Sequence, residues 1–301
     1  MNPSPLELRL KIILPEDYHD SYEEDVEPVS MGSAGLRFDA NGQAAWNEMW
    51  DTFCDLAMAG GPPHKGRLLE PASPAAIDAE PDRYTAVVEE IRRGIRMVTG
   101  LDAESGPAPG WVRVTCESEA MAGWLLRAIV IENVAAQADG PHLDLPASPA
   151  YRLEKEIKNV VTVMAKTCHY WQDHMLWTQQ LAIGRLFDTL AEESPLVVPD
   201  PSVDEPADDP HPSAASLAEA VRRDTGLSRS THRYRGWLGI DCPTVRAAVW
   251  MMRLVIAGNV LSRREETTLF LPVNDAHDPG GERVASVLRQ VCDLARARGV
   301  L

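Results

Sequence analysis

The sequence has few cysteines and no long apolar run, and each shortage excludes a class of protein. Its five cysteines are odd in number and widely spaced, and they contain no Cys-x-x-Cys pair. We therefore expect reduced thiols that pack in the core of a cytoplasmic protein, with a lone reactive Cys168 as the alternative. No stretch reaches 18 uncharged apolar residues, because Arg127 and Glu132 interrupt the most apolar segment, so no membrane span is predicted.

Basic residues are also in the minority. The 301 residues contain 45 acids and 29 bases, which gives a net charge of −16. Much of the excess is local, since residues 16–27 hold seven acids and residues 200–209 hold five, with no base in either stretch. The remainder of the chain is nearly neutral, which argues against a nucleic-acid or anionic-membrane partner.

One segment of the chain repeats. When the sequence is shifted by 126 residues, residues 99–146 align without a gap with residues 225–272, and 14 of the 48 positions are identical. We infer an internal duplication from this identity. The identical pairs include Gly100 and Gly226, Trp111 and Trp237, Arg127 and Arg253, and Asn133 and Asn259.

Both copies show the same order of expected elements. Each begins with an alternating segment typical of a half-buried strand, continues with a helix that is apolar on nearly every side, and adds a short strand that ends at proline. Ser118 and Thr244 are expected to cap these helices. The expected strands are residues 111–116, 142–146, 237–242 and 268–272, and the expected closing helices are residues 152–192 and 282–298.

The N-terminal region has the features of a third, more divergent repeat. Residues 6–14 predict an additional strand, because charges lie inside their apolar run and no cleavage pattern of a secretory signal follows. The predicted fold class is α/β, with three tandem βαβα-like units and an N-terminal strand in a layered sheet-and-helix architecture. If each βαβ crossover is right-handed, its two strands are parallel. The third repeat is expected to contain strands at residues 35–39 and 67–71 and helices at residues 44–59 and 84–98.

The predicted domain boundaries follow from this pattern. Residues 1–75 hold the N-terminal strand, the acidic arm and the first unit, and residues 76–194 hold the second unit with its long closing helix. Residues 195–215 form a linker rich in proline and acids, and residues 216–301 form the third unit.

A polar stripe on the helix after the second copy is the first candidate site. Its members follow one another at steps of three or four residues, which places them on one helix face. The stripe is either a solvated face or the wall of a pocket. In a pocket, Lys166 would bind an anion, His169 would transfer a proton and Asp173 would orient the His169 ring. The six residues are Lys155, Asn159, Thr162, Lys166, His169 and Asp173, with Asn159 as a further ligand contact.

The spacing of the histidines argues against a metal site. His169 and His174 are five residues apart, whereas a spacing of four places two imidazoles on one face of an α-helix. Cys168 does not correct this geometry. No metal site is predicted, and any other cofactor is unknown.

Two further groups are candidates for anion binding. Arg127 and Arg253 hold equivalent places in very apolar helices, and a buried guanidinium needs an acceptor. They form internal salt bridges, or they approach a common cleft and clamp an anionic ligand. The Gly/Pro-rich loop at residues 60–66 has two interpretations. It only ends the preceding helix, or it is a stiff loop that offers His64 for proton transfer and Lys65 for anion binding.

These features favour an enzyme that acts on a small anionic metabolite at a junction between repeated units, with Lys and Arg holding the anion and His performing acid–base catalysis. The alternative is a non-catalytic ligand sensor or a scaffold that assembles through its acidic segments. The sequence does not decide between enzyme and binding protein. It predicts a small anionic partner and is compatible with a homo-oligomer.

Overall fold

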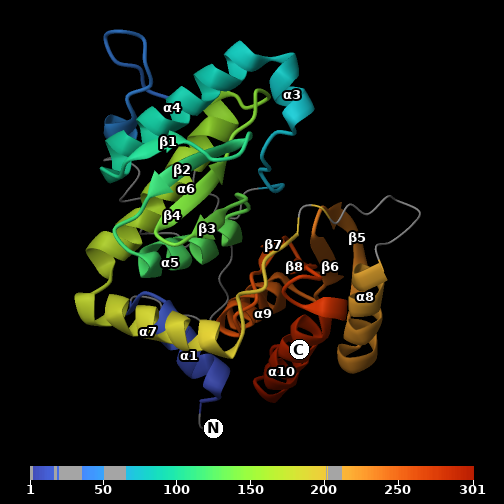
Figure 1. Cartoon of the computed structure of the whole chain (residues 1–301). Helices are drawn as coiled ribbons and strands as arrows, with labels where there is room; N and C mark the ends of the chain where they lie inside the picture. The colour runs from blue at the N-terminus through green and yellow to red at the C-terminus, as the bar shows by residue number, and fades with distance from the viewer. Residues whose placement is uncertain (1–2, 17–18, 20–35, 51–65, 201, 203–211) are drawn as a thin grey trace. The chain divides into compact units, whose positions relative to one another are not determined.

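The computed structural model describes residues 3–16, 19, 36–50, 66–200, 202 and 212–301. The chain divides into two compact units (Figure 1). Unit 1 comprises Met1–Glu27 and Ala182–Leu301, and unit 2 comprises Pro28–Leu181. Both units mix helices and strands, which agrees with the predicted α/β class. None of the described helices is long and apolar enough to cross a membrane.

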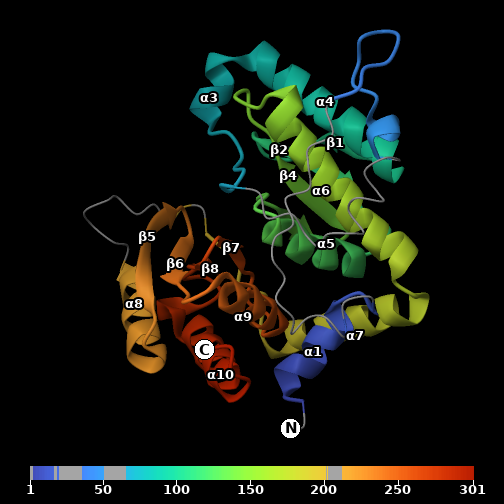
Figure 2. The ribbon, with the colours of Figure 1, turned by 180° about the vertical axis from the view of Figure 1, so that it is seen from behind.

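Unit 2 contains a four-stranded sheet with helices on one face. The strands lie in the order β1-β2-β4-β3, and every neighbouring pair is antiparallel. The strands lie in front of α6 in Figure 1, and α6 lies in front of them in the opposite view of Figure 2. The elements are α3 (Pro74–Ala79), α4 (Pro81–Thr99), β1 (Ala103–Ser105), β2 (Trp111–Thr115), α5 (Glu119–Ile131), β3 (Gln137–Asp139), β4 (His142–Pro146), η2 (Leu153–Ile157), α6 (Lys158–His169) and η3 (Tyr170–His174).

The alternation of side chains in β2 and β4 explains why one face of this sheet is covered. Val112 and Val114 are fully buried, and they lie opposite the buried Leu145 and Leu143 of β4. The intervening pair, Arg113 and Asp144, lies on the other face, where the two side chains form an ion pair of 2.7 Å. Period-two alternation therefore sends the apolar residues toward the helices.

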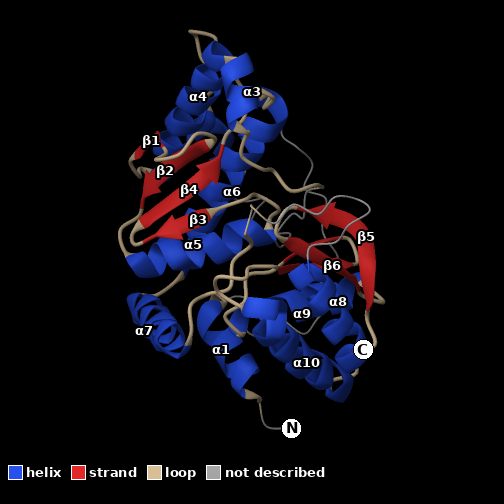
Figure 3. Cartoon of the chain, turned by 45° about the vertical axis from the view of Figure 1, so that its right-hand side comes forward, coloured by secondary structure: helices blue, strands red, loops and turns tan. Residues whose placement is uncertain are grey.

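Unit 1 has a sheet of the same topology. Its strand order is β5-β6-β8-β7, again antiparallel throughout. Figure 1 labels its four strands, and Figure 3 shows β5 and β6 from another side. From β2 to β4, each element boundary recurs 126 residues later in β6 to β8. The elements are α1 (Pro5–Ile13), which packs against α9, then α8 (Pro212–Thr225), β5 (Ser228–Tyr234), β6 (Trp237–Asp241), α9 (Val245–Ala257), β7 (Arg263–Glu265), β8 (Thr268–Pro272), η4 (Pro279–Gly281) and α10 (Glu282–Ala297), while α7 (Trp177–Glu193) spans the border between the units.

Equivalent helices of the two units are capped by the same or similar residues. Gly100 and Gly226 follow α4 and α8 with φ of 71° and 78°, a left-handed conformation that glycine adopts without strain. Ser118 and Thr244 precede α5 and α9, and their hydroxyls accept hydrogen bonds from backbone N–H groups at the third helical position, as expected for N-caps.

The predicted parallel pairing is wrong. The short strands β3 and β7 were not recognised in the sequence, because three residues are too few to show an alternating pattern and β3 is exposed throughout. Each forms a hairpin with the strand that follows it. This hairpin reverses the chain once more, so β4 and β8 return antiparallel to β2 and β6.

The predicted strand at residues 6–14 is also wrong, because this segment forms the helix α1. Ser4 is its N-cap, and Pro5 stands in the first turn, where its missing N–H costs nothing. The Glu7 carboxylate accepts from Ser4 N–H at 2.6 Å, and the Ser4 hydroxyl accepts from Glu7 N–H at 3.2 Å. This capping box outweighs the strand-like alternation.

The described residues of the expected N-terminal repeat form no sheet of their own. Phe38 makes a single bridge to Ala44, and Leu69 makes one to Val134 of unit 2. The helix expected at residues 84–98 is part of α4, which directly precedes the sheet of unit 2. The long helix expected at residues 152–192 is interrupted, since Met175 is extended between η3 and α7.

Candidate functional site

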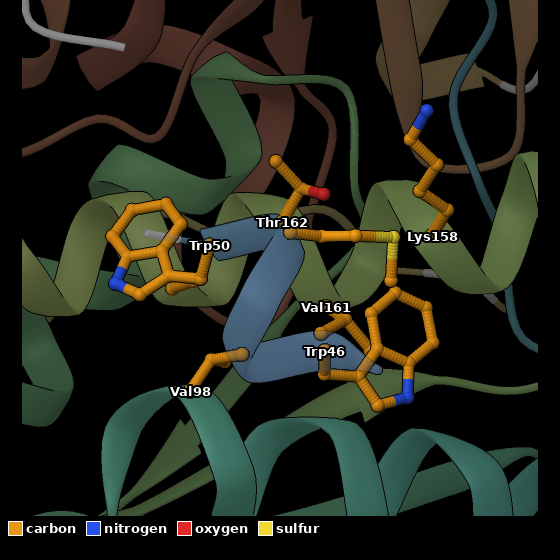
Figure 4. A pocket seen from close by; sticks show the side chains of 8 residues that line it. Trp46, Trp50, Val98, Lys158, Val161 and Thr162 are labelled. Atoms are coloured by element: carbon orange, nitrogen blue, oxygen red, sulfur yellow. The ribbon is translucent and has the colours of Figure 1, made fainter. Parts of the chain in front are cut away.

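A pocket lies along α6 in unit 2 (Figure 4). Together with the open solvent at its mouth, its empty space is about 350 Å³. Trp50 and Lys158 stand on opposite sides of it in Figure 4. Its described lining combines aromatic and aliphatic side chains with a hydroxyl and a cation: Trp46, Met49, Trp50, Val98, Lys158, Val161, Thr162 and Ala165.

The regular spacing of α6 and a close approach of α4 create this pocket. Lys158, Thr162 and Ala165 follow at steps of four and three residues, so they share one face of α6. On α4, Gly94 leaves room for the partner helix, because a Cβ atom at this position would lie 2.7 Å from Cγ2 of Val161. Partial burial lowers the pKa of Lys158.

His169 continues this face of α6 by one more turn and lies beside the pocket wall. Its ring meets Trp50 edge-on, with 5.8 Å between the ring centroids. Its Nδ1 lies 2.6 Å from Oδ2 of Asp173, the residue that the sequence predicted as its orienting partner. Since an ionised carboxylate can only accept, this contact places a proton on Nδ1 and leaves Nε2 on the other side of the ring.

His174 lies against the other nitrogen of His169. The two Nε2 atoms are 3.1 Å apart, and the rings are nearly perpendicular, with centroids 4.8 Å apart. The expectation that these residues point to different sides is wrong, because they are joined by the π-helical turn η3. In this turn the Met175 N–H donates to the Tyr170 carbonyl five residues earlier, which brings positions i and i+5 together.

Lys166 faces the core of unit 2. Only 4% of its side chain is exposed, and its Nζ donates to Oε1 of Glu132 on the C-terminal side of α5 at 2.8 Å. Burial lowers the pKa of Lys166 in spite of the Glu132 carboxylate, which acts in the opposite direction. The predicted polar stripe therefore splits, with Thr162 and His169 on the pocket side and Lys166 inside. The role of Lys166 in anion binding stays a prediction.

The two equivalent arginines belong to different units. Arg127 is buried in α5 of unit 2, where its Nη1 donates to the carbonyl of Gly123 at 2.8 Å and burial lowers its pKa to about 10. Arg253 is buried in α9 of unit 1. Their common cleft stays a prediction. Asn159 is half-buried on α6 and is absent from the described lining of the pocket.

Several candidates lie outside the described residues, namely His64, Lys65 and most of the two acidic stretches. The described cysteines are free and buried. Burial raises the pKa of Cys116 to about 12 and also raises that of Cys168. A thiol that stays protonated is a poor nucleophile, which disfavours a reactive Cys168.

The sequence analysis did not identify this pocket. Trp50 is only half-buried and lines the pocket, and Trp177 is 69% exposed. The available signal was the spacing of Trp46 and Trp50, which are four residues apart and therefore share one face of a helix.

Comparison with known proteins supplies no relative. No family model, curated protein or solved structure matches this chain.

Proposed function

We propose that this protein is an enzyme that acts on a small molecule with an apolar body and an anionic group, bound in the α6 pocket of unit 2. The main support for this proposal is the position of Trp50, which lines the pocket and also contacts the ring of His169. A ligand in the pocket would therefore contact a tryptophan that itself touches the oriented imidazole. Pockets with an apolar lining and a few convergent polar groups are the usual form of small-molecule sites.

Lys158 supports the anionic part of this proposal. It is the cation of the pocket lining, and it stands across the pocket from Trp50. We therefore assign anion binding to Lys158 and proton transfer to the pair formed by His169 and His174, with Asp173 as a positioning residue.

We also infer that the α6 pocket belongs to one of two duplicated folds. The 14 identical positions and the element boundaries that recur after 126 residues support the duplication. The free thiols of the described cysteines support the expected cytoplasmic location.

A ligand screen with matched variants tests the proposal. Small carboxylates and phosphates with aromatic or aliphatic bodies are expected to raise the melting temperature of the full chain. Lys158→Gln and Trp50→Ala should remove this shift, whereas Lys155→Gln, at a lysine that is 65% exposed outside the pocket, should keep it. A ligand shift that survives both pocket substitutions would contradict the proposed site.

Turnover of the ligands found in the screen separates an enzyme from a binding protein. His169→Ala is expected to reduce turnover by at least a hundredfold while the ligand still shifts the melting temperature. Binding without any chemical change of the ligand would favour a ligand-sensing protein.

A further inference from the structure

The contact between His169 and His174 is stronger evidence for a ligand than either residue alone. Both Nε2 atoms face each other at 3.1 Å, and they come from adjacent turns of one chain segment. Two ligand nitrogens at about 2.0–2.1 Å from a tetrahedral metal ion lie about 3.3 Å apart. The two imidazoles are therefore already close to the separation that a shared metal ion requires.

The backbone has an unusual form where it creates this contact. In a regular α-helix, residues five apart project to different sides, and His174 would turn away from His169. The π-helical turn η3 adds the rotation that brings the two rings together. Single π-turns inserted after α-helices are rare and occur frequently at functional sites.

Asp173 completes the arrangement of a metal-ligating histidine. Its Oδ2 accepts from Nδ1 of His169 at 2.6 Å, which fixes the tautomer whose Nε2 carries the lone pair. Histidines that bind metals almost always donate their other N–H to a carboxylate, a carbonyl or water, and this contact raises the basicity of the ligating nitrogen.

We propose that His169 and His174 bind one divalent transition-metal ion through their Nε2 atoms, with Asp173 as the positioning residue. Imidazole nitrogens suit Zn²⁺, Cu²⁺ and Ni²⁺ and do not suit Mg²⁺ or Ca²⁺, which require oxygen. Among the described residues, no group of three or more His, Cys, Asp or Glu side chains could hold a metal ion. Within the described part of the chain, the remaining positions of the ion would be filled by water and by the substrate.

The chemical consequence rests on the proposed pocket, but in the metal-bound form the water on the ion replaces the imidazole pair as the base, because a nitrogen bound to the metal transfers no proton. A bound Zn²⁺ makes its water acidic enough to supply hydroxide near neutral pH, and it polarises an oxygen of the substrate. Trp50, which lines the pocket, contacts the His169 ring, so the ion would be held next to a residue of the pocket wall. Metal binding itself is measured without substrate and does not depend on this step.

The test is the affinity of the full chain for Zn²⁺, measured by calorimetry after removal of any affinity-tag histidines. We expect one ion per chain. His169→Gln and His174→Gln should each weaken binding at least tenfold, and Asp173→Asn should weaken it about 10–100-fold. His142→Gln, at a half-buried histidine on β4, is the matched control and should bind as the unaltered chain does.

Two measurements on the unaltered chain test the metal site even if the variants fail to fold. Zn²⁺ should protect His169 and His174, but not His142, from acylation by diethyl pyrocarbonate, as mapped by mass spectrometry. Bound Co²⁺ should show a visible spectrum without sulfur charge-transfer absorption, which excludes ligation by the buried thiols.

The absence of saturable Zn²⁺ binding, or binding that survives both glutamine substitutions, would overturn the metal site. The 3.1 Å contact would then be a hydrogen bond between two imidazoles. The proposed function fails separately, since it predicts a ligand-dependent melting shift through Lys158 and Trp50 that is measured in chelator-treated protein.

Discussion

At the scale of single residues, the ion pair of Lys166 and Glu132 is the least expected feature of unit 2. Both side chains are almost fully buried, and taking two charges out of water costs several kcal/mol before their attraction offsets it. The fold does not require this pair. Gly258 holds the position in unit 1 that is equivalent to Glu132, and a Cβ atom there would lie 2.5 Å from Cγ1 of Val287.

Replacing Lys166 alone should therefore lower the free energy of unfolding more than replacing Lys166 and Glu132 together. We expect Lys166→Met to lower the free energy of unfolding by about 3–5 kcal/mol, because Glu132 stays buried without its cation. The double variant Lys166→Met, Glu132→Gln should lose less than this single variant. Urea denaturation of the full set at pH 7 gives the coupling energy, and equal losses in the single and double variants would contradict the explanation.

Glu7 predicts a pH dependence of unit 1. Burial alone would raise the pKa of Glu7, but hydrogen bonds from Arg298 and Ser4 and the charge of Arg298 outweigh it, so the pKa lies below its ordinary value of 4.5. A carboxylate with a lowered pKa stabilises the folded state above its unfolded pKa, and this contribution disappears as the pH falls through the folded value. The wild-type protein should therefore lose stability below about pH 4.5.

The variant Glu7→Gln should lack this part of the acid response and lose about 2 kcal/mol at pH 7. Arg9→Ala is the control. Its pair with Glu193 is exposed and 3.4 Å long, and such pairs contribute less than about 0.5 kcal/mol. Melting temperatures between pH 3 and pH 7 measure both effects. An unchanged acid response in Glu7→Gln would show that other carboxylates cause it.

At the scale of elements, Gly94 determines how closely α4 approaches α6. Glycine inside a helix normally costs about 1 kcal/mol relative to alanine, so Gly→Ala substitutions tend to stabilise. Here the added Cβ would lie 2.7 Å from Cγ2 of Val161 and 3.1 Å from Nε1 of Trp46. We expect Gly94→Ala to destabilise the protein by about 1–3 kcal/mol and to distort the pocket that Val161 and Trp46 line.

The second substitution Val161→Ala checks this cause. It removes the Cγ atoms that the new methyl group meets, so Gly94→Ala should be tolerated better in this background than in the wild-type chain. Chemical denaturation supplies the four stabilities. Additive losses would mean that contact with Val161 does not explain the effect.

The sequence predicted several of the longer elements but missed the helix α8 and the seven-residue strand β5, whose residues are polar and mostly exposed. Four strands, the two most apolar helices and their caps follow from alternation, apolar periodicity and Ser118 or Thr244. The three-residue strands were missed because their sequence carries no period, and α1 was mistaken for a strand because its capping box was overlooked.

The candidate site was predictable only in part, for a related reason. The contact between His169 and Asp173 follows from α-helical spacing and was expected. The contact between His169 and His174 depends on a π-helical turn, and helical periodicity contains no signal for such a turn. Lys166 was predicted on one stripe with Thr162 and His169, but it faces the core, and its partner Glu132 lies 34 residues away, beyond the reach of a local sequence pattern.

At the scale of the whole molecule, two compact units carry the same sheet topology, and this makes matched substitutions possible. Ser118 caps α5 in unit 2, and Thr244 caps α9 in unit 1, with the same hydrogen-bond pattern. Ser118→Ala and Thr244→Ala should each cost about 1 kcal/mol, because each leaves a backbone N–H at the start of a helix without its acceptor.

The comparison of these two variants with the double variant tests whether the units are energetically separate. The caps share no partner and lie in different units, so their losses should add within about 0.5 kcal/mol. Denaturant unfolding followed by circular dichroism measures the sum, and hydrogen exchange shows which amides each substitution exposes. Ser118→Ala should speed exchange in unit 2 alone, since a local loss of stability spreads only through the cooperative unit that contains it. Faster exchange throughout both units after either substitution would show that the two sheets unfold as one cooperative structure in spite of their separate cores.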